Sequence, residues 1–78
     1  MEHQIDATAD AKGQKCPMPV LLATRTIKTL ESGQVMLVEA TDSGSQSDIP
    51  SWAKDTGHEL LDVSNGDDGV FRYVIRKN

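Results

Sequence analysis

The chain has 78 residues, a net charge of −4 and a sequence pI of about 4.9. A chain this short buries only about 60% of its unfolded surface on folding, so we expect one domain over residues 1–78 with a thin core. The acidic balance, without any run of lysine or arginine, disfavours direct nucleic-acid binding, which needs a basic face.

A single cysteine cannot form a disulfide within the chain. Small domains of oxidising compartments usually carry several disulfides. The N-terminus lacks the basic and apolar regions of a signal peptide, and apolar stretches such as residues 35–38 are too short to span a bilayer. These features predict a cytoplasmic protein with no membrane contact.

The first third of the chain predicts a strand, a loop and a helix. Residues 4–9 alternate weakly, which favours a strand with Ile5 and Ala7 on one face. Residues 10–15 are polar and predict a loop, and residues 17–32 predict a helix that ends before Gly33. The apolar positions of this helix follow the three-and-four spacing of one buried stripe. They are Val20, Ala23, Ile27 and Leu30.

The middle of the chain predicts a central strand and a second helix. Residues 35–40 are apolar on both faces, as in a strand inside a sheet. After a polar loop over residues 41–47, Asp48 is expected as the N-cap of the helix, or else as a polar residue at the mouth of a site, and Pro50 lies in the first turn. The buried side and the end of this helix are expected at Trp52, Ala53 and Gly57.

The last third predicts a hairpin. Residues 59–64 form a strand with Leu61 and Val63 on one face, and residues 65–69 have the Asn-Gly and Asp-Gly content of a hairpin loop. Residues 70–76 form the last strand, with inward positions at Phe71, Tyr73 and Ile75. The order predicts a parallel first pair and an antiparallel last pair. We therefore expect a two-layer α/β (α+β) sandwich, in which a mixed four-stranded sheet carries both helices on one face.

Cys16 is the strongest candidate for chemistry because it stands at the predicted start of the first helix. A helix start leaves backbone N–H groups without intrahelical partners and concentrates the positive end of the dipole, which favours the reactive thiolate. Lys15 adds a positive charge, and Pro17 and Pro19 suit a first turn. The alternative is a buried apolar cysteine that only fills space.

A lone activated thiol restricts the possible reactions. A hydrolase would need a histidine partner, and His3 and His58 lie near predicted strand starts. A dithiol cycle needs a second cysteine, and the spacing of a metal site is absent, so we expect no metal and no cofactor. Accepting sulfane sulfur and passing it on needs only one thiolate. This chemistry suits a carrier better than an enzyme with turnover of its own.

Three further features have competing interpretations. Asp10 fits a turn hydrogen bond, while Gly13 fits a positive φ or a close backbone approach in the loop before Cys16. Trp52 is expected in the core. The C-terminal basic residues form either a solvated strand face or a docking surface for an acidic partner; they are Arg72, Arg76 and Lys77.

Residues 10–19, with Cys-Pro-x-Pro after an Asp-x-x-Gly loop, resemble the signature of the TusA family, also called SirA-like or YedF-like. Asp48-Ile49-Pro50 is similar to the family's opening of its second helix, and residues 71–77 resemble its last strand. The resemblance implies a β-α-β-α-β-β sandwich with Cys16 exposed at one edge.

The resemblance also implies a function. Cys16 would carry a persulfide received from a cysteine desulfurase or a rhodanese-like donor, for delivery to a DsrE-type relay or to the tRNA-thiolation machinery. The residues expected to shape the site or bind partners are Asp10, Gly13, Lys15, Pro17, Met18, Pro19 and Asp48. Better-known relays have arginine where this chain has Ser47, and often glutamate where it has Met18. The alternatives are a regulatory or partner-binding module that uses the same surface, and a redox sensor that forms mixed disulfides through Cys16.

Overall fold

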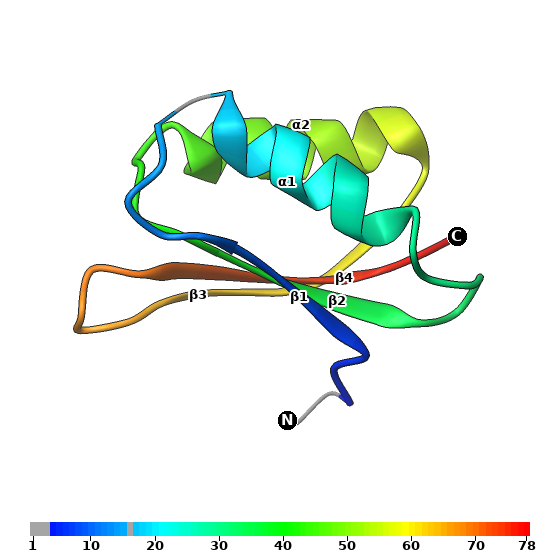
Figure 1. The fold of residues 1–78 in the computed structure, drawn as a ribbon. Coiled ribbons are helices and arrows are strands. Elements are labelled where there is room, and N and C mark those ends of the chain that lie inside the picture. The colour runs from blue at the N-terminus through cyan, green and yellow to red at the C-terminus, as the bar shows by residue number, and fades with distance from the viewer. Residues whose placement is uncertain (1–3, 16) are drawn as a thin grey trace.

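The structure, a computed structural model, describes residues 4–15 and 17–78 (Figure 1). Its elements in chain order are β1 (Ala7–Ala11), α1 (Met18–Ile27), β2 (Val35–Ala40), α2 (Ser45–Thr56), β3 (Glu59–Asn65) and β4 (Phe71–Arg76). The four strands form one sheet in the order β1-β2-β4-β3, in which β1 and β2 are parallel and the other pairs antiparallel. Both helices lie over the same face of the sheet (Figure 1). The predicted two-layer sandwich is therefore confirmed.

The core lies between the helices and the two central strands, β2 and β4. Met36 pairs with Ile75 and Val38 with Tyr73 across these strands, and all four side chains are fully buried. The helices cover them with apolar side chains, among them Ala23, Ile27 and Ile49. As predicted, β2 is a central strand, and Tyr73 and Ile75 face inward with Phe71 packed beside the core.

The first strand begins later than residues 4–9 because its pairing with β2 begins later. The parallel ladder runs from Ala7↔Met36 to Ala11↔Ala40, so Ala9 and Ala11 are the buried residues. Ile5 precedes the ladder and is 37% exposed. The expectation that residues 4–9 form the strand was therefore wrong by about half of its length, and the loop that follows begins two residues later than expected, after Ala11.

The first helix is shorter than residues 17–32. α1 ends at Ile27, and the chain continues through turns in which Thr29 N–H donates to Thr26 O at 3.0 Å and Leu30 N–H to Ile27 O at 3.2 Å. This tighter path still buries Leu30, so three members of the predicted stripe are buried while Val20 is half-buried. Gly33 has a φ of +89° and ends the connection rather than the helix itself.

The second helix starts three residues before Asp48. Gly44 is the N-cap, Asp48 lies in the first turn without capping the helix, and Pro50 lies inside it, so the predicted start was wrong. Turns with three-residue spacing lead into α2: Ser45 N–H donates to Asp42 O at 3.1 Å. Pro50 has no N–H to donate to the carbonyl of Gln46, which is an exposed residue of the first turn. Gly57 ends the helix, as predicted, and the structure places it in the left-handed conformation.

The edge strand β3 departs from simple alternation. A register shift between Leu60 and Asp62 leaves Leu61 in a bulge, so that Leu60 rather than Leu61 packs against the core. Val63 is opposite Tyr73 but is 46% exposed. A bulge changes which face of the sheet the neighbouring residues occupy. The prediction that Leu61 and Val63 share one face was therefore wrong.

Candidate functional site

The start of α1 forms the centre of the candidate site. Pro17 is exposed at the N-cap position, and Pro19 is fully buried in the first turn. Met18 N–H donates to Lys15 O at 2.8 Å as the chain enters the helix. Cys16 itself lies outside the described residues. The first turn of α1 carries no acidic residue, so no carboxylate of this helix offsets the positive end of its dipole.

The loop before Cys16 is held to the end of β2. Gly13 has a φ of +78°, and its N–H donates to Thr41 Oγ1 at 2.9 Å. Lys12 N–H donates to Asp10 Oδ1 at 3.1 Å, which is the expected turn hydrogen bond. Adding a Cβ to Gly13 would meet nothing within 4 Å, so the backbone conformation rather than space favours glycine here. Nothing in the sequence pattern pointed to Thr41.

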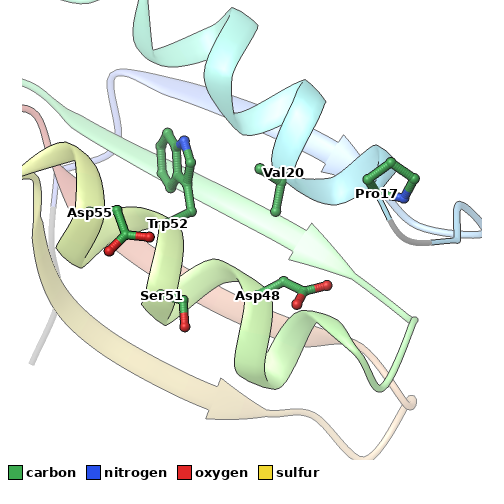
Figure 2. Close-up of a pocket in the computed structure, with 6 residues that line it drawn as sticks. All are labelled: Pro17, Val20, Asp48, Ser51, Trp52 and Asp55. Atoms are coloured by element: carbon green, nitrogen blue, oxygen red, sulfur yellow. The ribbon is translucent and has the colours of Figure 1, made fainter.

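A groove runs between the two helices next to the start of α1 (Figure 2). Its volume is about 390 Å³. Residues from both helices line it: Pro17, Val20, Asp48, Ser51, Trp52 and Asp55. The structure thus places Asp48 at a mouth shared with Pro17, which was the alternative to its predicted capping role.

Trp52 lies in this groove and not wholly in the core. It is half-buried and packs against the core cluster. Its ring centroid lies 5.6 Å from that of His58, with the planes tilted by 44°. His58 Nδ1 accepts the Asn78 N–H at 3.1 Å, and burial, with a smaller effect of Lys77, lowers the pKa of His58. The tryptophan therefore links the groove to the C-terminus.

The first turn of α2 is fixed by a buried polar contact. The hydroxyls of Ser45 and Tyr73 lie 2.8 Å apart and share a hydrogen bond. Burial raises the pKa of Tyr73, although the bond from Ser45 acts in the opposite direction. Ser45 lies less than one helical turn before Asp48. This bond to Tyr73 of β4 therefore holds the start of the helix that forms one side of the groove.

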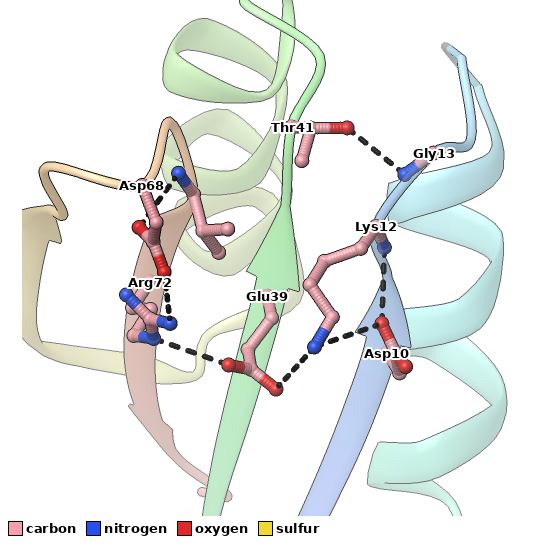
Figure 3. A network of polar contacts seen from close by, with 8 residues as sticks. Asp10, Lys12, Gly13, Glu39, Thr41, Asp68 and Arg72 are labelled. Atoms are coloured by element: carbon pink, nitrogen blue, oxygen red, sulfur yellow. Dashed lines mark hydrogen bonds and ion pairs between the residues drawn. The ribbon is translucent and has the colours of Figure 1, made fainter.

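The predicted basic stripe is largely paired within the protein. Arg72 bonds Glu39 and Asp68, each at 3.1 Å, and Lys12 lies 3.8 Å from Glu39 (Figure 3). The hydrogen bond from Arg72 lowers the pKa of Asp68. Of the other two cations, Arg76 pairs with Glu59, and Lys77 Nζ donates to Leu30 O at 2.5 Å. This arrangement favours an ion-paired strand face over a docking surface for an acidic partner.

Two kinds of feature are absent from the described part of the chain. Within residues 4–15 and 17–78, no group of three or more histidine, aspartate or glutamate side chains is placed to hold a metal ion. In the same part of the chain, neither helix is long and apolar enough to cross a membrane.

The fold and the site define a class of protein: a small α+β sandwich whose lone cysteine precedes a proline-rich helix start beside an interhelical groove. The family described as sulfurtransferase TusA matches residues 7–77. The chain belongs to this family.

Named relatives agree with this assignment. The chain is 44% identical over 73 residues to the sulfur carrier protein TusA of Allochromatium vinosum, covering 94% of this chain and 95% of that protein. It is 47% identical over 77 residues to a protein of Halobacterium salinarum named as a candidate sulfur carrier, covering 97% and 94% of the two chains. A crystal structure of a SirA-like protein from Desulfitobacterium hafniense superposes with a TM-score of 0.80 at 31% identity, covering 90% of this chain and 95% of that one. These relatives support a role as a sulfur carrier.

Proposed function

We propose that Cys16 holds sulfane sulfur as a persulfide and relays it from a cysteine desulfurase or rhodanese-like donor to a protein acceptor. The acceptor is a DsrE-type relay or a component of tRNA thiolation. The observation that carries this proposal is the helix start two residues after Cys16, whose first turn holds no acidic residue. A carrier that works through a free thiol needs a reducing compartment, so we place it in the cytoplasm.

The transfer needs one thiolate and no added oxidant. The Cys16 thiolate attacks the outer sulfur of a donor persulfide, the donor's S–S bond breaks, and the donor leaves as a thiolate. The product is a persulfide on Cys16. In the second transfer the acceptor thiolate attacks this outer sulfur, and Cys16 leaves as a thiolate. The positive helix end stabilises Cys16 in its anionic form at the start of the first transfer and at the end of the second.

The surrounding residues have supporting roles in this proposal. Gly13 and Asp10 shape the loop that leads to Cys16. The exposed Lys15 adds positive charge, and the buried Pro19 fixes the first turn. Three others face the partner: Pro17, Met18 and Asp48.

The test is intact-mass spectrometry after incubation with a cysteine desulfurase, cysteine and pyridoxal phosphate, and separately with thiosulfate and a rhodanese. We expect a gain of one sulfur atom that a reductant reverses. Cys16→Ser should show no gain, with an unchanged circular dichroism spectrum. Sulfur uptake by the serine variant, or no uptake by the wild-type protein from either donor system, would refute the proposal.

A further inference from the structure

We propose that the groove between α1 and α2 docks a segment of the protein that exchanges sulfur with Cys16, and that this segment presents an arginine or lysine next to an apolar side chain. The assignment of the partner as a sulfur-exchanging protein rests on the proposed function. The chemistry of the docked segment rests on the groove itself.

The groove offers apolar contact directly beside the proposed carrier residue. Pro17, the residue after Cys16, forms one end, and Val20 and Trp52 face each other from the two helices (Figure 2). Trp52 keeps part of its ring accessible because it is only half-buried. An apolar side chain of a partner that enters here would bury surface on these three residues while its neighbours reach Cys16.

The charge of the lining selects a cation. Among the described residues that line the groove, Asp48 and Asp55 are aspartates, and none is lysine or arginine. Both lie on α2, Asp48 toward the Pro17 end of the groove and Asp55 beside Trp52 (Figure 2). A guanidinium is attracted both by carboxylates and by an indole face, so this set of groups is complementary to an arginine.

Asp55 is the more informative of the two carboxylates. It lies in the last turn of α2, where the helix dipole disfavours a negative charge. Within the described part of the chain it has no ion-pair partner. Its charge is therefore available to a partner, and the proposal needs Asp48 only as a second negative charge at the mouth.

The same charges disfavour the direct approach of small anionic sulfur donors through the groove. Polysulfide and thiosulfate carry negative charge and would meet two carboxylates there. A protein donor that presents a cationic segment is instead attracted, and this attraction weakens as salt screens exposed charges beyond about 10 Å at 0.1 M. The groove thus favours protein donors and acceptors over free anions.

The experiment uses a capped peptide with the sequence Gly-Leu-Arg-Leu-Gly and a matched peptide with citrulline in place of arginine. Binding is followed by amide shifts in ¹H–¹⁵N NMR spectra of the whole chain. The variant is Asp55→Lys, and the control is Asp67→Lys, which makes the same charge change at an exposed residue of the β3–β4 turn. Neither substitution removes a buried group, and Asp55→Lys places a cation where the helix dipole favours it.

We expect the arginine peptide to shift Val20, Ser51, Trp52 and Asp55, and the citrulline peptide to bind several-fold more weakly. Asp55→Lys should weaken binding of the arginine peptide roughly tenfold, since it converts an exposed attraction into a repulsion, while Asp67→Lys stays within about twofold. Equal binding of the two peptides, equal effects of the two substitutions, or shifts centred elsewhere would overturn the inference.

A second measurement separates this inference from the proposed function. Initial rates of sulfur loading from a cysteine desulfurase are compared for the wild-type protein and both lysine variants. A lower rate for Asp55→Lys alone supports docking in the groove. If the wild-type protein loads and Asp55→Lys loads equally fast, the docking inference fails and the carrier function stands. If peptides bind as expected but Cys16 takes up no sulfur, the carrier function fails, and with it the assignment of the partner.

Discussion

The buried bond between Ser45 and Tyr73 gives the sharpest test of what holds the site in place. Tyr73→Phe removes one hydroxyl and leaves the Ser45 hydroxyl without a partner in a position that is 1% exposed. Ser45→Ala has the converse effect on a tyrosine that is 0% exposed. In each case a polar group stays buried and unsatisfied. Removing both hydroxyls leaves no such group.

The expected magnitudes follow from this asymmetry. Each single substitution should cost about 1–2 kcal/mol, the penalty for one unsatisfied buried polar group. The double variant should cost less than the sum by about 1 kcal/mol, since groups that share a bond are not additive. These are large effects for a chain of 78 residues, whose free energy of unfolding is on the order of 4–12 kcal/mol.

The assay is urea denaturation followed by the fluorescence of Trp52, the chain's single tryptophan. Ser64→Ala, at an exposed position of β3, is the matched control and should change stability by less than about 0.5 kcal/mol. The slope with urea should not change if the folded and unfolded states keep their exposed surfaces. Additivity of the two single substitutions within about 0.3 kcal/mol would refute the reasoning.

Two further predictions concern the end of α2. The lowered pKa of His58 means that the unfolded chain binds a proton more tightly than the folded one. Stability from this group is therefore present above the unfolded pKa of about 6.5 and is lost as pH falls through the folded value. Urea midpoints measured between pH 5 and pH 8 should fall with falling pH for this reason, and His58→Gln should remove this part of the pH dependence. Gly57→Ala places a side chain at a φ of +81° and should cost about 1 kcal/mol, seen as a fall of about 4–8 °C in Tm; a Tm equal to that of Lys54→Ala would contradict this.

Much of the fold could be predicted because its signals are local. The strand at residues 35–40, the hairpin glycines and the left-handed Gly57 each depend on a few neighbouring residues. The errors arose where pairing between strands determines the bounds and the register of a strand. The first strand shifted because β2 selects Ala7 as the first partner, and the bulge at Leu61 depends on the match between β3 and β4.

The site divides in the same way. Pro17 and Pro19 predict the helix start after Cys16, and the resemblance to the family rests in part on the same residues. The groove could not be predicted, because it exists only where α1 and α2 pack side by side and leave Trp52 half-buried. Asp48 illustrates the difference. Aspartate is a common N-cap residue, so a capping role was predicted. The helix begins earlier, at Ser45, and Asp48 instead lines the groove together with Pro17.

The connection between β2 and α2 explains how so small a core can fix both sides of the site. Thr41, directly after β2, accepts the bond from Gly13 and so holds the loop that leads to Cys16. Four residues later Ser45 bonds Tyr73 of β4 and holds the helix that carries Asp48 and Trp52. Both contacts are made from one short segment that directly follows the central strand β2. One short connection thus ties both the loop before Cys16 and the helix that lines the groove to the central strands, without a large core.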